Sequence, residues 1–239
     1  MADLKVIWYG HGTTKIETPK GLKILVDPFL EGNPACPPSL RNDRSIDLLL
    51  LTHGHADHFG DAISLMKETK AVVMCIFEMK NYLNSRGIPT DRVIGFNIGG
   101  TAQFDGISVT MTTALHSGTY NDGRNIVDVG PPVGYVVKLE DERNIYFAGD
   151  TDIFSEMEFI GEFHKPFLAV LPIDGFYNMS PKAAARAVQL LQSEQVMPIH
   201  HSTFPILWGK PKMLRAELDN LGLNDVNVIK TSPGTVIEL

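Results

Sequence analysis

Short apolar runs rich in Val, Ile and Leu recur along the whole chain, separated by segments that carry Gly, Pro, Asn and Asp. Apolar runs of this length that end at turn-forming residues are typical of buried β-strands. We expect most of the following runs to be strands: residues 4–8, 23–26, 47–51, 71–75, 107–112, 133–139, 144–148, 168–171 and 196–199. The pattern predicts a protein that is rich in β-sheet.

Helical periodicity is clearest at residues 181–192, where Ala184, Val188 and Leu191 share one face. Ser180 is a suitable N-cap, and Pro181 suits the first helical position. Weaker helical patterns cover residues 61–69, 78–85, 152–163 and 212–221. Because strands dominate the first two thirds as hairpin-like pairs and helices interleave later, the order of elements predicts an α/β fold of mixed sheets covered by helices.

The loop-like segments are residues 28–43, rich in Pro and Asn, and residues 117–132, rich in Gly, Asn and Asp. Loops of this length in a domain are often functional. The chain has 239 residues, 44% of them hydrophobic and 21% charged, and no internal repeat. This length and composition predict one globular domain over residues 1–239.

The net charge of −7 and the absence of a Lys-rich or Arg-rich run argue against a nucleic-acid partner. The longest apolar runs are far too short for a membrane span, which takes about 20 residues, so we expect no membrane partner. Residues 1–9 lack the pattern of a signal peptide, and neither Cys36 nor Cys75 has a CxxC partner. We therefore expect a cytoplasmic protein, and the sequence leaves open whether it is a homo-oligomer.

The strongest chemical signal is the sequence THGHADH at residues 52–58, which directly follows an expected strand. Imidazole and carboxylate groups are ligands for zinc, manganese or iron. In an extended chain His53, His55 and Asp57 would project to one side, while the adjacent His58 would point elsewhere and serve a second ion. A lone histidine in a loop is commonly just solvated. This cluster, however, would be costly to desolvate without a cation.

Three further candidate ligands share one placement, because His116, Asp150 and His200 each follow an expected strand. Sheets commonly gather functional side chains at the carboxyl ends of their strands. Taken singly, Asp150 is also compatible with a turn beside Gly149, and His116 with a solvated side chain. The adjacent His200 and His201 are not distinguished by spacing alone.

These residues together resemble the metallo-β-lactamase superfamily. The signature of that superfamily corresponds to His53-x-His55-x-Asp57-His58, its third-motif histidine to His116, its bridging aspartate to Asp150 and its last histidine to His200. The chain is also similar to small metal-dependent hydrolases related to the ascorbate-6-phosphate lactonase branch. That similarity lies in Gly10-His11-Gly12, Val26-Asp27-Pro28, Phe147-Ala148-Gly149-Asp150-Thr151 and Pro198-Ile199-His200.

The resemblance implies a four-layer αββα sandwich of two mixed β-sheets flanked by helices. It also implies two divalent metal ions per chain, with zinc as the first expectation and manganese or iron as alternatives. One ion would be held by His53, His55 and His116, the other by Asp57, His58 and His200, with Asp150 bridging them. The family pattern thus favours His200 over His201 as a ligand, and Asp57 and His58 are the expected catalytic residues.

Other residues are candidates for supporting roles. Asp27 resembles the family aspartate that orients a ligand histidine, although it also fits a plain turn before Pro28. His11 is expected either to approach the metals or the substrate or to be a plain histidine at the end of a strand. His201 is expected either to support a ligand or to be packed without a role in the site. Arg124, in the loop after His116, is a candidate clamp for a carboxylate or phosphate, although a solvated arginine explains it equally.

The function implied by the resemblance is metal-dependent hydrolysis, with hydroxide delivered between two ions to a small, anionic ester, lactone or phosphodiester. The preference for anions follows from the net charge of the site. Two divalent ions together with Asp57, Asp150 and a bridging hydroxide carry a net charge of about +1. A phosphodiesterase or nuclease is one alternative, but related nucleases usually carry a large insertion or a basic arm. A di-iron redox protein is another, but those members typically carry Glu where this chain has His55.

Overall fold

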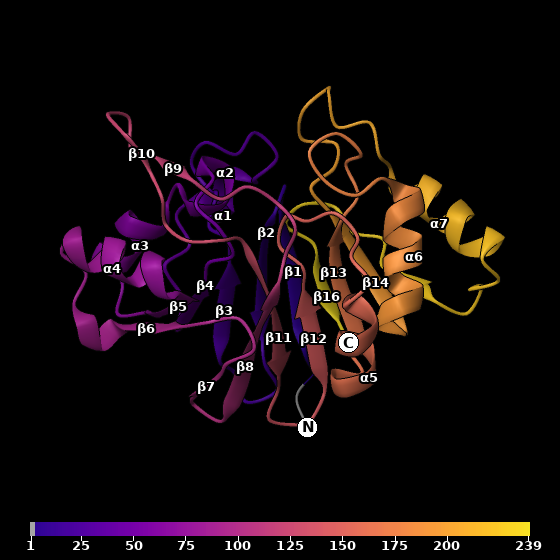
Figure 1. The fold of residues 1–239 in the computed structure, drawn as a ribbon, viewed down its shortest axis with the longest axis horizontal. Coiled ribbons are helices and arrows are strands. Elements are labelled where there is room, and N and C mark those ends of the chain that lie inside the picture. Colours follow the sequence, from indigo (N-terminus) through magenta and orange to yellow (C-terminus); the bar gives the residue numbers. More distant parts are fainter. Residues whose placement is uncertain (1–2) are drawn as a thin grey trace.

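Two seven-stranded β-sheets packed face to face form the centre of the molecule (Figure 1). The computed structural model describes residues 3–239. The first sheet has the order β16-β1-β2-β3-β4-β5-β6 and the second the order β15-β14-β13-β12-β11-β8-β7. Both sheets are mixed, since β3 to β6 and β12 to β15 run parallel while their neighbours pair antiparallel.

The strand bounds are as follows. The first sheet contains β1 (Lys5–Gly10), β2 (Thr13–Glu17), β3 (Lys23–Val26), β4 (Leu48–Leu50), β5 (Val72–Ile76), β6 (Val93–Phe96) and β16 (Val236–Glu238). The second contains β7 (Thr101–Phe104), β8 (Ile107–Thr113), β11 (Val133–Lys138), β12 (Asn144–Phe147), β13 (Leu168–Pro172), β14 (Gln195–Ile199) and β15 (Asn227–Val228). A separate antiparallel pair joins β9 (Tyr120–Asn121) to β10 (Ile126–Val127).

Helices cover the outer side of each sheet, which confirms the expected four-layer sandwich (Figure 1). The first sheet is accompanied by α1 (Pro38–Arg41), α2 (Ala56–Phe59), α3 (Ala62–Glu68), α4 (Phe77–Ser85) and the short 3₁₀ turn η1 (Thr90–Arg92). The second is covered by α5 (Met157–His164), α6 (Pro181–Leu191) and α7 (Pro211–Asn220). Within residues 3–239, no helix combines the length and apolar character that crossing a bilayer requires.

Alternation along β11 shows why its apolar run forms a strand between two layers. Tyr135 and Val137 belong to the core between the sheets, whereas Val136 belongs to the core beneath the helices. Successive side chains of a strand point to opposite faces, so a strand buried on both faces reads as a continuous apolar run. Such runs were therefore easy to recognise in the sequence.

Several of the elements that sequence patterns missed have polar or exposed side chains. Strand β2 is buried but has the sequence TTKIE, and β7 is an edge strand with exposed Thr101. The helix expected at residues 152–163 begins only at Met157, because the preceding residues form turns in which Leu115 and Phe154 carbonyls accept N–H groups. The segment 117–132, expected as a loop, contains the β9–β10 pair.

One buried hydrogen bond joins the two sheets next to the histidine cluster. The hydroxyl of Tyr135 on β11 donates to the Leu51 carbonyl, with 2.7 Å between the oxygens. Burial raises the pKa of Tyr135 well above its usual value, so the hydroxyl stays a donor. Because Leu51 lies two residues before His53, the bond fixes the end of β4 against the second sheet.

Replacing this hydroxyl should lower global stability. We expect Tyr135→Phe to reduce the free energy of unfolding by about 1 to 2 kcal/mol, because the Leu51 carbonyl loses its buried partner. Urea unfolding of the metal-free protein measures this difference. Tyr82→Phe is the matched control, because within residues 3–239 the Tyr82 hydroxyl accepts a hydrogen bond from the exposed Arg86 and forms no other, so we expect less than about 0.5 kcal/mol. Equal losses in the two variants would contradict the account.

Candidate metal centre

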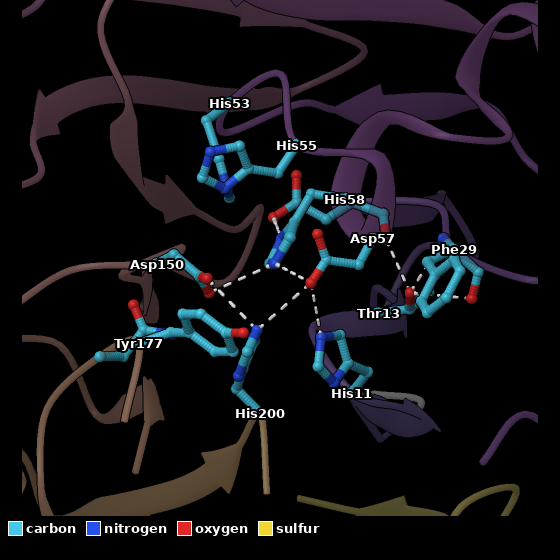
Figure 2. A network of polar contacts seen from close by, with 12 residues as sticks. His11, Thr13, Phe29, His53, His55, Asp57, His58, Asp150, Tyr177 and His200 are labelled. Atoms are coloured by element: carbon cyan, nitrogen blue, oxygen red, sulfur yellow. Dashed lines mark hydrogen bonds and ion pairs between the residues drawn. The ribbon is translucent and has the colours of Figure 1, made fainter. Parts of the chain in front are cut away.

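The candidate ligands meet where the two sheets adjoin, at the carboxyl ends of their parallel strands (Figure 2). His53 follows β4, Asp150 follows β12 and His200 follows β14, while His116 follows the antiparallel β8. Both sheets therefore contribute to one site.

The turn after β4 divides the THGHADH segment between two groups of side chains. His55 has extended dihedral angles and precedes α2, so Asp57 and His58 lie on a helical turn. Alternation in an extended chain had suggested that Asp57 lies beside His53 and His55. That expectation is wrong, because the helix begins at Ala56 and turns Asp57 toward His58 and His200.

The first group contains His53, His55 and His116, whose ring nitrogens lie close enough to share one ion. His53 Nε2 is 3.0 Å from His55 Nδ1. His53 is fully buried, and His55 and His116 are half-buried. On its outer side, His55 Nε2 lies 3.3 Å from the hydroxyl oxygen of Ser117.

The second group contains Asp57, His58 and His200, together with His11. Asp57 Oδ2 lies 4.0 Å from His58 Nε2 and 3.7 Å from His200 Nε2. Asp57 Oδ2 also lies 2.8 Å from His11 Nε2 (Figure 2). His11 therefore orients the carboxylate from the side away from the first group.

Asp150 lies between the two groups and faces histidines of both. Its Oδ1 is 3.3 Å from His58 Nε2, and its Oδ2 is 3.2 Å from His200 Nε2 and 3.6 Å from His116 Nε2. Asp150 is the carboxylate that could be shared by two ions.

The donor atoms fit a metal ion better than they fit one another. His58 Nε2, His200 Nε2 and Asp150 Oδ1 are buried without a hydrogen-bond partner in the described chain, although they lie near each other. Separations of 3.2 to 4.0 Å bracket the roughly 3.3 Å expected between ligands of a tetrahedral zinc ion with bonds of about 2.0–2.1 Å. Aimed but unbonded atoms at these spacings are what a metal site requires.

Asp27 and Thr52 orient one histidine of each group from behind. Asp27 accepts hydrogen bonds from the Thr52 hydroxyl at 2.6 Å and the Thr52 N–H at 2.8 Å, and its Oδ2 lies 2.9 Å from His58 Nδ1. Because the Thr52 proton is directed to Asp27, the hydroxyl oxygen can accept the Nδ1 proton of His53 at 2.9 Å. With Nδ1 of each ring bonded behind the centre, Nε2 is the nitrogen that each ring can offer to an ion.

Asp174 lies behind His200 as Asp27 lies behind His58. It is not among the residues that the sequence analysis predicted. This fully buried carboxylate has its Oδ2 3.1 Å from His200 Nδ1. Its Oδ1 accepts the backbone N–H groups of Phe176 and Tyr177 at 2.8 and 2.7 Å. Its place just after β13, similar to that of Asp150 after β12, was a signal that could have identified it.

The electrostatics of the centre are dominated by its buried carboxylates. Burial lowers the pKa of His200, but Asp150, Asp174 and Asp57 outweigh burial and raise it to about 9. Burial also lowers the pKa of His58, and Asp150 and Asp27 together raise it well above the usual value. The buried carboxylates therefore favour protons on His58 and His200. A divalent cation would displace those protons.

The remaining predicted residues have different surroundings. His11 is buried in contact with Asp57, as expected for a residue near the metals. His201 belongs to neither group and packs on Trp8, with 4.8 Å between ring centroids. Arg124 is exposed between β9 and β10 and does not line the cavity, so its expected role as an anion clamp is not supported.

A cavity of about 530 Å³ opens over the centre. It is lined by His11, Phe29, His55, Ala56, Asp57, His116, Ser117, Asp150, Tyr177, His200, Phe204, Ile206 and Leu207. Tyr177 and Phe204 belong to this lining, whereas Asn178 and Trp208, close to them in the sequence, do not. The latter two instead bond the Asp174 carboxylate and the Gly175 carbonyl, and so support the lining from behind.

Comparisons with known proteins identify the family and the fold of the chain. The profile of the Beta-lactamase superfamily domain matches residues 23–201. A metal-dependent hydrolase of Roseiflexus sp. is 41% identical over 96% of this chain and 95% of its own length. A metal-dependent hydrolase of Methanopyrus kandleri is 40% identical over 98% of this chain and 100% of its own length. The solved structure of a metallo hydrolase from Ignicoccus hospitalis is 34% identical, with a TM-score of 0.86, over 99% of this chain and 98% of its own.

Removing the charge of Asp174 should weaken metal binding without unfolding the protein. We expect Asp174→Asn to bind zinc about 10- to 100-fold more weakly, because the carboxylate behind His200 fixes the ring and raises its basicity. Competition with a chromogenic chelator measures the affinity. Asp152→Asn is the matched control, because the Asp152 side chain is exposed and bonds only the adjacent Ile153 N–H. Unchanged zinc affinity in Asp174→Asn would show that Asp174 does not support a ligand.

Proposed function

Because the chain belongs to the β-lactamase superfamily of metal-dependent hydrolases, we propose that it binds two divalent ions and hydrolyses a small ester, lactone or phosphodiester. The observation that carries the proposal is the position of Asp150 between two groups of histidines, with its oxygens 3.2 to 3.6 Å from His58, His116 and His200. A carboxylate in this position can serve two ions at once.

In this proposal each ion has its own ligands. One ion is held by His53, His55 and His116, and the other by Asp57, His58 and His200, with Asp150 shared. A donor set rich in imidazole favours zinc, although manganese and iron accept the same ligands. The unbonded ring nitrogens and the outer carboxylates Asp27 and Asp174 support these assignments.

The chemistry that divalent ions supply when bound is polarisation of a carbonyl or phosphoryl oxygen and a lowered pKa for water. Asp57 is the residue that we assign to proton transfer. It lines the cavity, and His11 Nε2 lies 2.8 Å from its Oδ2, so the carboxylate is held beside the space that a substrate would occupy. His58 does not line the cavity, so we assign it the role of ligand.

The substrate that we propose is a small molecule. A cavity of about 530 Å³ is within the usual range for small ligands, roughly 300–1,000 Å³. The net charge of −7 disfavours phosphate backbones as partners. A cytoplasmic location and a single domain over residues 1–239 stay predictions.

Loss of a ligand should remove both metal and activity. We expect His55→Ala and Asp150→Asn to hold fewer than the roughly two ions per chain of the unmodified protein, and to hydrolyse esters more than about 100-fold more slowly. Elemental analysis gives the metal content and circular dichroism the state of the fold.

The matched control is His164→Ala, a half-buried histidine at the end of α5 outside both groups, which should keep full metal content. Full activity in either ligand variant would sink the assignment. So would a metal content that falls equally in the control.

A further inference from the structure

Several large apolar side chains line the cavity over the candidate metal centre. We call Phe29, Tyr177, Phe204, Ile206 and Leu207 the apolar wall. The other lining residues include histidines and carboxylates of the centre. Figure 2 shows the rings of Tyr177 and Phe29 on either side of His11, Asp57 and His200. The same cavity thus offers both the centre and apolar surface to a small molecule.

No lysine or arginine is among the residues that line the cavity. The nearest basic side chain along the chain, Lys210, directs its ammonium to the Ser202 hydroxyl and the Leu207 carbonyl at 3.1 and 3.4 Å. Arg124 is exposed between β9 and β10. Apart from the centre itself, the described lining offers an anion no cationic partner, and apolar surface cannot replace the hydration of a charge.

Two of the three loops that carry the wall, those with Tyr177 and with Phe204 to Leu207, are bonded to each other. The Gly209 N–H donates to the Asp174 carbonyl at 2.9 Å, and the Trp208 ring N–H donates to the Gly175 carbonyl at 2.8 Å. Gly175 has φ +74°, and a Cβ there would lie 2.3 Å from the Trp208 ring. This close contact leaves little freedom for the loop that carries Tyr177.

Three members of the wall are left partly exposed by the described chain, whereas Leu207 is buried. Tyr177, Phe204 and Ile206 are 58%, 38% and 45% exposed. Exposed apolar side chains that gather at one cavity commonly mark a binding surface, because a ligand that covers them removes apolar area from water.

The wall also lies next to the residue that we assign to proton transfer. The rings of Phe204 and Phe29 approach His11 edge-on, with centroid separations of 5.4 and 5.8 Å. His11 in turn contacts Asp57 at 2.8 Å. If an apolar group of a substrate packed on these rings, the substrate bond next to that group would lie close to Asp57 and the centre.

From these contacts we infer that the substrate is an uncharged ester or lactone whose apolar group covers the wall while its carbonyl faces the centre. The inference rests on the proposed function and narrows it, since it replaces the anionic substrate expected from the ligand charge alone. In the reaction the acyl C–O bond breaks. The hydroxyl of water joins the acyl carbon, and the other proton reaches the leaving oxygen, giving an acid and an alcohol, or a hydroxy acid from a lactone.

The experiment compares p-nitrophenyl acetate, butyrate and hemisuccinate as substrates of the zinc-loaded protein. Butyrate adds two methylenes to acetate, and hemisuccinate has a similar length but ends in a carboxylate. We expect kcat/KM to rise about fourfold for each methylene that the wall covers. We expect hemisuccinate to be hydrolysed at least about tenfold more slowly than butyrate, because its charge would lie on apolar rings.

Variants of the wall connect this preference to named side chains. Phe204→Ala and Ile206→Ser should each reduce the butyrate-to-acetate ratio severalfold while keeping zinc content, since both side chains are partly exposed and contribute no ligand atom. Phe163→Ala is the matched control, because Phe163 is 72% exposed on α5 and does not line the cavity. It should leave the ratio unchanged.

The outcomes separate the inference from the proposed function. Hydrolysis of acetate with no rise for butyrate, or faster hydrolysis of hemisuccinate, overturns the apolar substrate and leaves the hydrolase proposal intact. A preference that persists in both wall variants also overturns it. Failure of the zinc-loaded protein on every ester, lactone and phosphodiester tested would overturn the proposed function itself, and the inference with it.

Discussion

The convergence of buried, unbonded imidazole and carboxylate atoms between the two sheets is the constraint on which the site depends. His58 Nε2, His200 Nε2 and Asp150 Oδ1 are removed from water and aimed at one another without hydrogen bonds. Such atoms carry a large desolvation cost that a cation at their centre would offset. The same carboxylates raise the pKa values of His58 and His200, which shows that the site favours positive charge.

Carboxylates behind the ligands connect this centre to the rest of the fold. Asp27 holds His58 and, through Thr52, His53, so strands β3 and β4 set the direction of two rings. Asp174 contacts His200 with one oxygen and the Tyr177 loop with the other. Through Asp174, the ligand side of the cavity and its apolar wall share one support. In the proposed function this shared support would couple the position of the substrate to that of a ligand.

The sequence could predict the sheets and most of the candidate site, because both leave local patterns. Strands buried on two faces read as continuous apolar runs, and the THGHADH segment places its ligands a few residues apart. Spacing alone misplaced Asp57, because the start of α2 cannot be read from a seven-residue motif. Asp174 and the apolar wall depend on loops that meet only in the folded chain. Their partners are distant in sequence, and no local pattern records them.

Anomalous diffraction from crystals grown with zinc tests the central claim most directly, because it locates ions without reference to activity. The account predicts two peaks about 3.5–4 Å apart, one against His53 and His116 and the other against His58 and His200, with Asp150 between them. Ordered crystals with no zinc peak among these side chains, or with zinc bound only elsewhere on the surface, would contradict it.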